Sequence, residues 1–108
     1  MDLITERELK QKQLDQAIKD LRGNGTAYAE AEKNYKILLR QEVLKLRDEG
    51  VAIGVIDKIC YGIPSVAEAR YQRDCAEAVY KANQEAINSL KLQIRIIDNQ
   101  VSREWVND

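Results

Sequence analysis

Residues 76–101, AEAVYKANQEAINSLKLQIRIIDNQV, carry the pattern that decides the fold. Side chains recur there at alternating spacings of four and three residues, and most of them are apolar: Ala76, Tyr80, Asn83, Ile87, Leu90, Ile94, Ile97 and Val101. A heptad spacing of this kind places its members on one stripe of an α-helix, and that stripe packs against a second helix. The stretch therefore predicts a long amphipathic helix with a helical partner.

The helix extends beyond the quoted stretch in both directions. Upstream, Pro64 precedes Ser65-Val66-Ala67-Glu68, which has the form of a capping box and predicts a helix start at residue 65. Downstream, neither glycine nor proline interrupts the chain. We expect one helix over residues 65–106, about 60 Å long at roughly 1.5 Å per residue.

The first half of the chain predicts a partner of matching length. Thr5 and Glu8 fit a second capping box, which opens a helix over residues 5–22, and Gly23-Asn24-Gly25 forms a hinge at 23–25. A further helix is expected over 26–49. The sequence leaves open whether these two helices are continuous through the hinge.

An elbow joins the two halves. Gly50 stands where a helix commonly ends in a left-handed residue, and the apolar residues that follow predict a short helix over 51–61. Folding the chain at this elbow brings apolar positions together along both arms, with Leu21 facing Ile94 and Leu39 facing Ala76. We therefore expect an all-α fold, a long antiparallel helical hairpin that forms a single domain over residues 1–108.

A two-helix hairpin has a thin core, because each helix buries one stripe only. Leu92, Ile96 and Trp105 lie off the seam and form a candidate interaction surface, since exposed apolar groups at this density mark partner sites. We expect a homodimer of hairpins in a four-helix arrangement. Asn83 is the candidate register residue, because a polar residue on a seam fixes register or oligomer number. Its expected neighbour across the hairpin lies near Glu32, and a solvent-facing Asn83 is an equal alternative.

Composition argues against enzymatic chemistry. The 108 residues include no histidine. Seventeen basic and 18 acidic residues give the chain a net charge of −1. Histidine-based catalysis is excluded, no phosphate-binding glycine pattern occurs, and Cys60 and Cys75 alone make a poor zinc site. We expect no enzyme activity, no catalytic, cofactor-binding or metal-binding residue, and no cofactor. The short apolar runs and the charged start predict no membrane association and a cytoplasmic location.

Two features point to nucleic acid, and both have a plainer explanation. Residues 51–70 resemble a helix-turn-helix, but with Gly62 as its turn the motif needs core residues where Asp57, Lys58 and Glu68 stand, so we favour the elbow. A candidate basic stripe comprises Lys33, Lys36, Arg40, Arg47, Arg70 and Arg73. Glutamates alternate with these basic residues on the second helix, which favours a solvated charged face over a phosphate-binding site.

Two segments carry a resemblance to a known group. YAEAEKNYKILLRQEVLKLRDEG (28–50) and AEARYQRDCAEAVYKANQEAINSLKLQIRIIDNQVSREW (67–105) resemble small coiled-coil accessory proteins of tailed phages and prophages of Gram-positive bacteria. The resemblance implies an intracellular phage accessory protein that acts in a bacterial host cytoplasm. We expect a non-enzymatic interaction protein, a helical hairpin that works by docking on a host or phage protein. Inhibition of a host defence system such as CRISPR is one concrete role. The alternative is a nucleic-acid-associated protein that uses residues 51–70 or the basic stripe.

Overall fold

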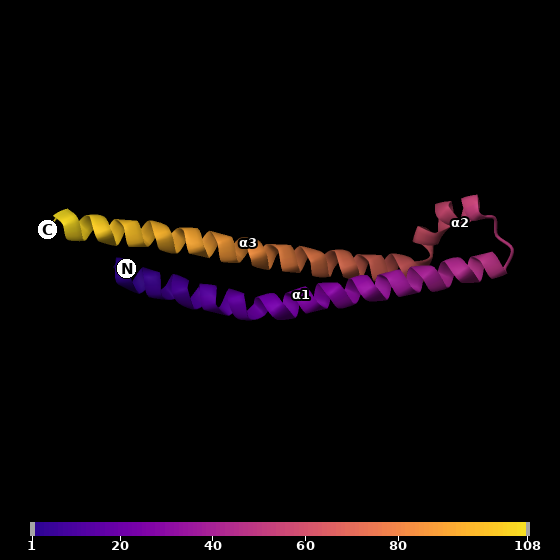
Figure 1. The fold of residues 1–108 in the computed structure, drawn as a ribbon, viewed down its shortest axis with the longest axis horizontal. Coiled ribbons are helices and arrows are strands. Elements are labelled where there is room, and N and C mark those ends of the chain that lie inside the picture. Colours follow the sequence, from indigo (N-terminus) through magenta and orange to yellow (C-terminus); the bar gives the residue numbers. More distant parts are fainter. Residues whose placement is uncertain (1, 108) are drawn as a thin grey trace. The chain divides into compact units, whose positions relative to one another are not determined.

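The computed structural model describes residues 2–107, and helices account for 94% of them. The elements are α1 (Leu3–Asp48), α2 (Ile53–Ile59), a 3-10 helix η1 (Cys60–Gly62) and α3 (Pro64–Asn107), as Figure 1 shows. No strand occurs between residues 2 and 107. The all-α prediction is therefore confirmed.

The predicted hinge at 23–25 is wrong, because α1 is helical without a break from Leu3 to Asp48. A glycine inside a helix costs about 1 kcal/mol relative to alanine, which is too little to stop a helix that packs against a neighbour. Asn24 adds a stabilising contact, since its side chain donates a hydrogen bond to Asn83 of α3 (2.8 Å). The residues around Asn24 in the sequence give no indication of this hydrogen bond to the other helix.

The helix ends agree with the predictions in part. Gly50 follows the end of α1 and has a positive φ of 86°. Its amide donates to the Arg47 carbonyl, and the Val51 amide donates to the Leu46 carbonyl. These two hydrogen bonds are those of a Schellman motif. Thr5 is not a cap, because its own amide donates to the Asp2 carboxylate (2.7 Å) and α1 begins at Leu3. α3 begins one residue before the predicted start, with Pro64 in its first position, where the missing amide is not needed.

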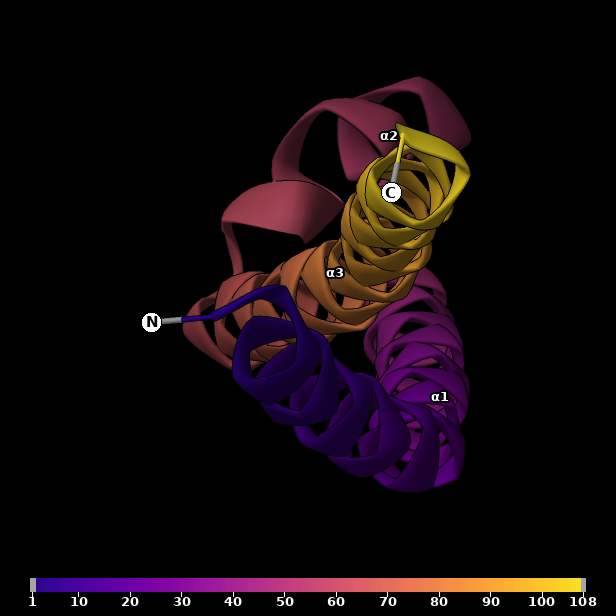
Figure 2. The ribbon, with the colours of Figure 1, turned by 90° about the vertical axis from the view of Figure 1, so that its left-hand side faces the viewer.

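The chain forms two compact units. The first contains the residues up to Asn24 and those from Tyr80 onward, and the second contains 25–79. In the first unit the two helices run antiparallel: Arg7 pairs with Asp98 (2.6 Å), and the Ala17 carbonyl accepts a hydrogen bond from Asn83. In the end-on view of Figure 2, the first turns of α1 (indigo) and the last turns of α3 (yellow) both face the viewer. The core of this unit is a cluster of Leu14, Ile87 and Ile94, against which Ala17, Leu21 and Leu90 pack.

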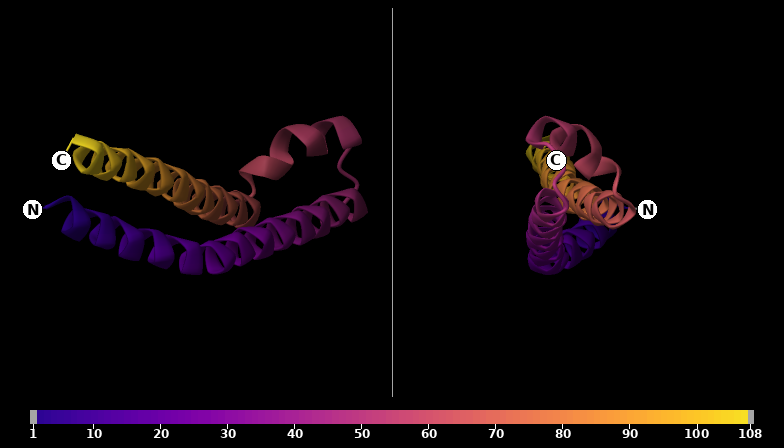
Figure 3. Two further views of the ribbon diagram at one scale, coloured as in Figure 1. Left: turned by 60° about the vertical axis from the view of Figure 1, so that its left-hand side comes forward. Right: turned by 90° about the vertical axis from the view of Figure 1, so that its right-hand side faces the viewer.

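The second unit contains the elbow. Its helices are also antiparallel, since Tyr28 is hydrogen-bonded to Glu77 and the Tyr35 ring lies 4.6 Å from the Arg73 guanidinium carbon. After Gly50 the chain turns back through α2 and η1 to the start of α3 (Figure 3). The predicted short helix over 51–61 is thus an α-helix over Ile53–Ile59 followed by a 3-10 turn. Ile56, Cys60 and Val66 are buried there.

The predicted register of the arms is wrong by about two turns of helix. Asn83 does not meet Glu32; its hydrogen bonds go to Ala17 and Asn24. A heptad pattern repeats every seven residues, so a slip of one heptad keeps the apolar stripes matched and the pattern alone cannot choose between registers.

Candidate interaction surface

Two of the three predicted surface residues share a face of α3. Leu92 and Ile96 are four residues apart and about half exposed, at 53% and 48%. Leu92 is two residues from the core residue Ile94, which is roughly 200° around a helix of 3.6 residues per turn. The pair therefore projects away from the core of its unit.

Trp105 does not join that face. It is nine residues beyond Ile96, about half a turn around the helix after whole turns are removed. Its 78% exposed side chain instead lines a hollow of about 220 Å³ with Asp2, Leu3, Ile4, Val101 and Glu104. The structure thus separates the predicted surface into a Leu92–Ile96 face and a Trp105 hollow at the end of α3.

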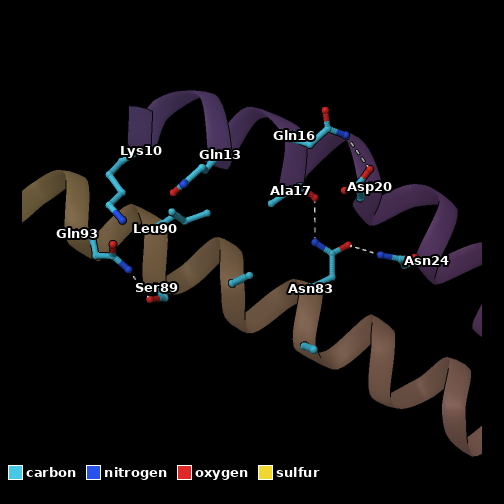
Figure 4. A pocket seen from close by; sticks show the side chains of 12 residues that line it. Lys10, Gln13, Gln16, Ala17, Asp20, Asn24, Asn83, Ser89, Leu90 and Gln93 are labelled. Atoms are coloured by element: carbon cyan, nitrogen blue, oxygen red, sulfur yellow. Dashed lines mark hydrogen bonds between the residues drawn. The ribbon is translucent and has the colours of Figure 1, made fainter. Parts of the chain in front are cut away.

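A larger open groove of about 710 Å³ lies between α1 and α3 in the first unit (Figure 4). We call it the α1–α3 groove; its lining residues are Lys10, Gln13, Gln16, Ala17, Asp20, Asn24, Ala82, Asn83, Ala86, Ser89, Leu90 and Gln93. Most members are small or carry an amide. Sequence reasoning missed this groove because most of its residues are polar or small.

Asn83 lies half-buried in that groove, and both the oxygen and the nitrogen of its side-chain amide form hydrogen bonds. Its oxygen accepts from Asn24 (2.8 Å) and its nitrogen donates to the Ala17 carbonyl (2.9 Å). No buried side-chain nitrogen or oxygen lacks a partner among the residues that the structure describes. The predicted register residue is therefore satisfied inside its own chain, and its hydrogen bonds need no second copy.

The basic stripe lies wholly in the second unit, where several members already have contacts. Arg73 is only 20% exposed; it pairs with Asp74 (2.8 Å), which raises its pKa, and it covers the Tyr35 ring. Lys36 pairs with Glu32 (3.6 Å). Arg70 lies over Tyr61. Lys33, Arg40 and Arg47 are exposed.

The elbow places charges on its outside. Asp57, Lys58 and Glu68, which stand where a helix-turn-helix needs core residues, are all exposed. Cys60 is buried and Cys75 is exposed, and both are free thiols. The 51–70 segment thus packs through Ile56, Cys60 and Val66, with its charged residues in solvent.

Hydrogen bonds shift the pKa values of Tyr28 and Asp2. A hydrogen bond to Glu77, together with burial and the nearby Glu32 charge, raises the pKa of Tyr28 to about 12. The Thr5 amide lowers the pKa of Asp2, as expected for a carboxylate at a helix N-terminus. Across residues 2–107, no group of three or more metal-binding side chains is close enough to hold an ion.

Comparison with known proteins adds no assignment. No family model matches the chain, and neither curated proteins nor solved structures show a significant match. In the described part, no helix combines the length and apolar character that spanning a membrane requires.

Proposed function

We propose that the protein is a non-enzymatic interaction protein that works by docking on another protein. One observation carries the proposal: of the described residues, eight apolar side chains are buried while fourteen large ones are exposed. Helix pairs of this kind bury little of their apolar surface alone, and exposed apolar groups in such numbers mark surfaces that partners cover.

The proposal includes an architecture for the whole chain. It is an antiparallel helical hairpin, two copies of which associate into a four-helix arrangement. The antiparallel contacts within each unit, Arg7 with Asp98 and Tyr35 with Arg73, support this arrangement.

The resemblance to phage and prophage coiled-coil proteins supports the biological setting that we propose. We place the protein in a bacterial host cytoplasm, where it docks on a host or phage protein. Inhibition of a host defence system such as CRISPR is the first specific role to test.

Affinity capture tests the docking function. Tagged protein is expressed in a Gram-positive host, and captured proteins are quantified by mass spectrometry against two variants, Leu92→Gln with Ile96→Gln and, as a matched control, Leu44→Gln. Leu44 is an exposed apolar residue of the second unit. A partner that the wild type and the control retain and the double variant loses supports the proposal. Equal recovery by all three contradicts it.

A nucleic-acid function is the second candidate, and the exposed Lys33, Arg40 and Arg47 favour it. A gel-shift assay over a salt series tests it, because binding through phosphates weakens steeply as salt rises. Sequence-selective binding of duplex DNA that persists at physiological salt would promote this candidate. No shift at low salt removes it.

A further inference from the structure

The α1–α3 groove is a second contact face on each of its helices. In α1, the core residues Leu14 and Leu21 each follow directly after a groove residue, Gln13 and Asp20. Neighbouring residues differ by about 100° around a helix, so the groove lies roughly at a right angle to the core stripe. Helices with two contact faces at this angle are the building units of a four-helix arrangement.

The lining of the groove fits a helix better than a small ligand. Ala17, Ala82 and Ala86 have short side chains that let another backbone approach closely. A small-molecule site instead needs convergent polar groups. Six of the polar side chains in the groove are already hydrogen-bonded to one another: Asn24 with Asn83, Gln16 with Asp20, and Gln93 with Ser89.

The charges of the groove are complementary to themselves. Lys10 and Asp20 both line it, near opposite ends (Figure 4), and ten residues separate them, about 15 Å along a helix. A two-fold axis near residue 15 brings Lys10 of each copy opposite Asp20 of the other. Gln16 donates a hydrogen bond to the Asp20 carboxylate (2.9 Å), which orients it at the rim.

The spacing on α1 agrees with this pairing. Lys10, Gln13, Ala17, Asp20 and Asn24 follow one another at three and four residues, the repeat of a coiled-coil face. About the same axis, Gln13 of one copy meets Ala17 of the other. A long side chain thus faces a short one, and like charges never meet.

We infer that a second copy of this chain covers the α1–α3 groove, with α1 packed antiparallel to α1 of the other copy and two reciprocal Lys10–Asp20 pairs. The inference rests on the self-association in the proposed function and names the surface that makes it. The interface is isologous, so each substitution acts twice.

Sedimentation equilibrium over a concentration series, at low and physiological salt, tests the inference. The variants are Lys10→Glu, Lys10→Glu with Asp20→Lys, Ala86→Arg to block the groove, and Lys12→Glu as a control. Lys12 is exposed on α1 and does not line the groove. Circular dichroism checks that every variant keeps its helix, which is expected because Ala86 is also exposed.

The wild type should reach twice the 12.4 kDa chain mass. Lys10→Glu should raise the dimer Kd by roughly tenfold at low salt, because it replaces two attractions by two repulsions, and the charge-swapped double variant should return to within about threefold of wild type. Ala86→Arg should abolish the dimer, and Lys12→Glu should leave it unchanged.

Three results would each overturn the inference. A dimer that survives Ala86→Arg uses another surface, and the self-association of the proposed function then stands. A double variant as weak as Lys10→Glu excludes the two-fold pairing. A wild type that stays monomeric at every concentration removes the dimer itself, while docking on a foreign partner is still decided by affinity capture.

Discussion

Asn24 and Asn83 are joined by a hydrogen bond of 2.8 Å although 59 residues of sequence separate them. Asn24 lies between two glycines, at the weakest point of α1, and Asn83 lies on the seam of α3, where it also donates to Ala17. The bond therefore connects the point where α1 most easily breaks to the one polar position of the opposite stripe. A polar pair of this kind fixes the pairing of two helices, because a slipped register leaves both amides without partners.

A double-mutant cycle measures that bond. Asn24→Ala, Asn83→Ala and the double variant should together show a coupling energy of about 1 kcal/mol in urea unfolding, the usual net worth of a half-buried hydrogen bond. Replacing Gln16, whose bond to Asp20 stays on one helix, serves as the control. Additive losses would mean that the two amides do not act together.

The continuity of α1 predicts the effect of removing a glycine. A methyl group added at Gly23 meets no atom within 4 Å, so Gly23→Ala should stabilise the fold by about 1 kcal/mol through helix propensity. Gly50→Ala should destabilise it by a similar amount, because Gly50 has a positive φ of 86° that alanine adopts with strain. Thermal melting checks both variants. A loss of stability in Gly23→Ala would indicate a break at 23–25.

Tyr28 predicts a dependence on alkaline pH. Its pKa is about 12 in the folded chain and about 10 in the unfolded chain, so the folded state holds the proton more tightly. The stability from this difference is complete below pH 10 and is lost as the pH rises from about 10 through 12. A hydrogen bond with Cys75 also raises the pKa of Tyr71, so ultraviolet titration should show late-titrating phenols, and Tyr28→Phe should remove the Tyr28 share of that late transition. Glu77→Gln should move that transition to lower pH, and a late transition unchanged in Tyr28→Phe would assign it to another tyrosine.

Two substitutions of charged residues in the elbow should leave the stability of the fold almost unchanged. Lys58 and Glu68 are exposed, so Lys58→Ala and Glu68→Ala should each change the free energy of unfolding by less than about 0.5 kcal/mol. Val66→Ala is the contrast, since Val66 is fully buried and its truncation should cost roughly 1–3 kcal/mol. Unfolding in either charged-residue variant would reveal a buried pair and refute the elbow.

The sequence was sufficient for the elements that depend on local chemistry. The heptad stripe of 76–101 predicts α3, and Gly50 predicts the end of α1, because helix periodicity and positive φ are properties of short segments. The continuity of α1 through 23–25 was not predictable, since Asn24 gains its partner from the other helix. The register was not predictable either, because a slip of seven residues leaves an apolar stripe unchanged.

The candidate surfaces could likewise be predicted only in part from the sequence. Leu92 and Ile96 are visible as apolar residues off the seam, and the structure keeps them exposed on one face. Trp105 looks similar in sequence but lies with Ile4 and Val101 in a separate hollow, because α3 is still helical where α1 begins. The α1–α3 groove had a usable signal in the three-and-four spacing of Lys10, Gln13, Ala17, Asp20 and Asn24. That signal is weak in sequence because the residues are polar or small.

The central claim is that the exposed apolar face serves a partner and not the fold, and one paired measurement tests it most directly. The variant carrying Leu92→Gln and Ile96→Gln is compared with wild type for its free energy of unfolding and for its affinity for the captured partner. Stability should change by less than about 1 kcal/mol, since glutamine is a good helix former and neither side chain is buried, while affinity should fall at least about tenfold. A variant that loses stability and keeps its affinity would contradict the account.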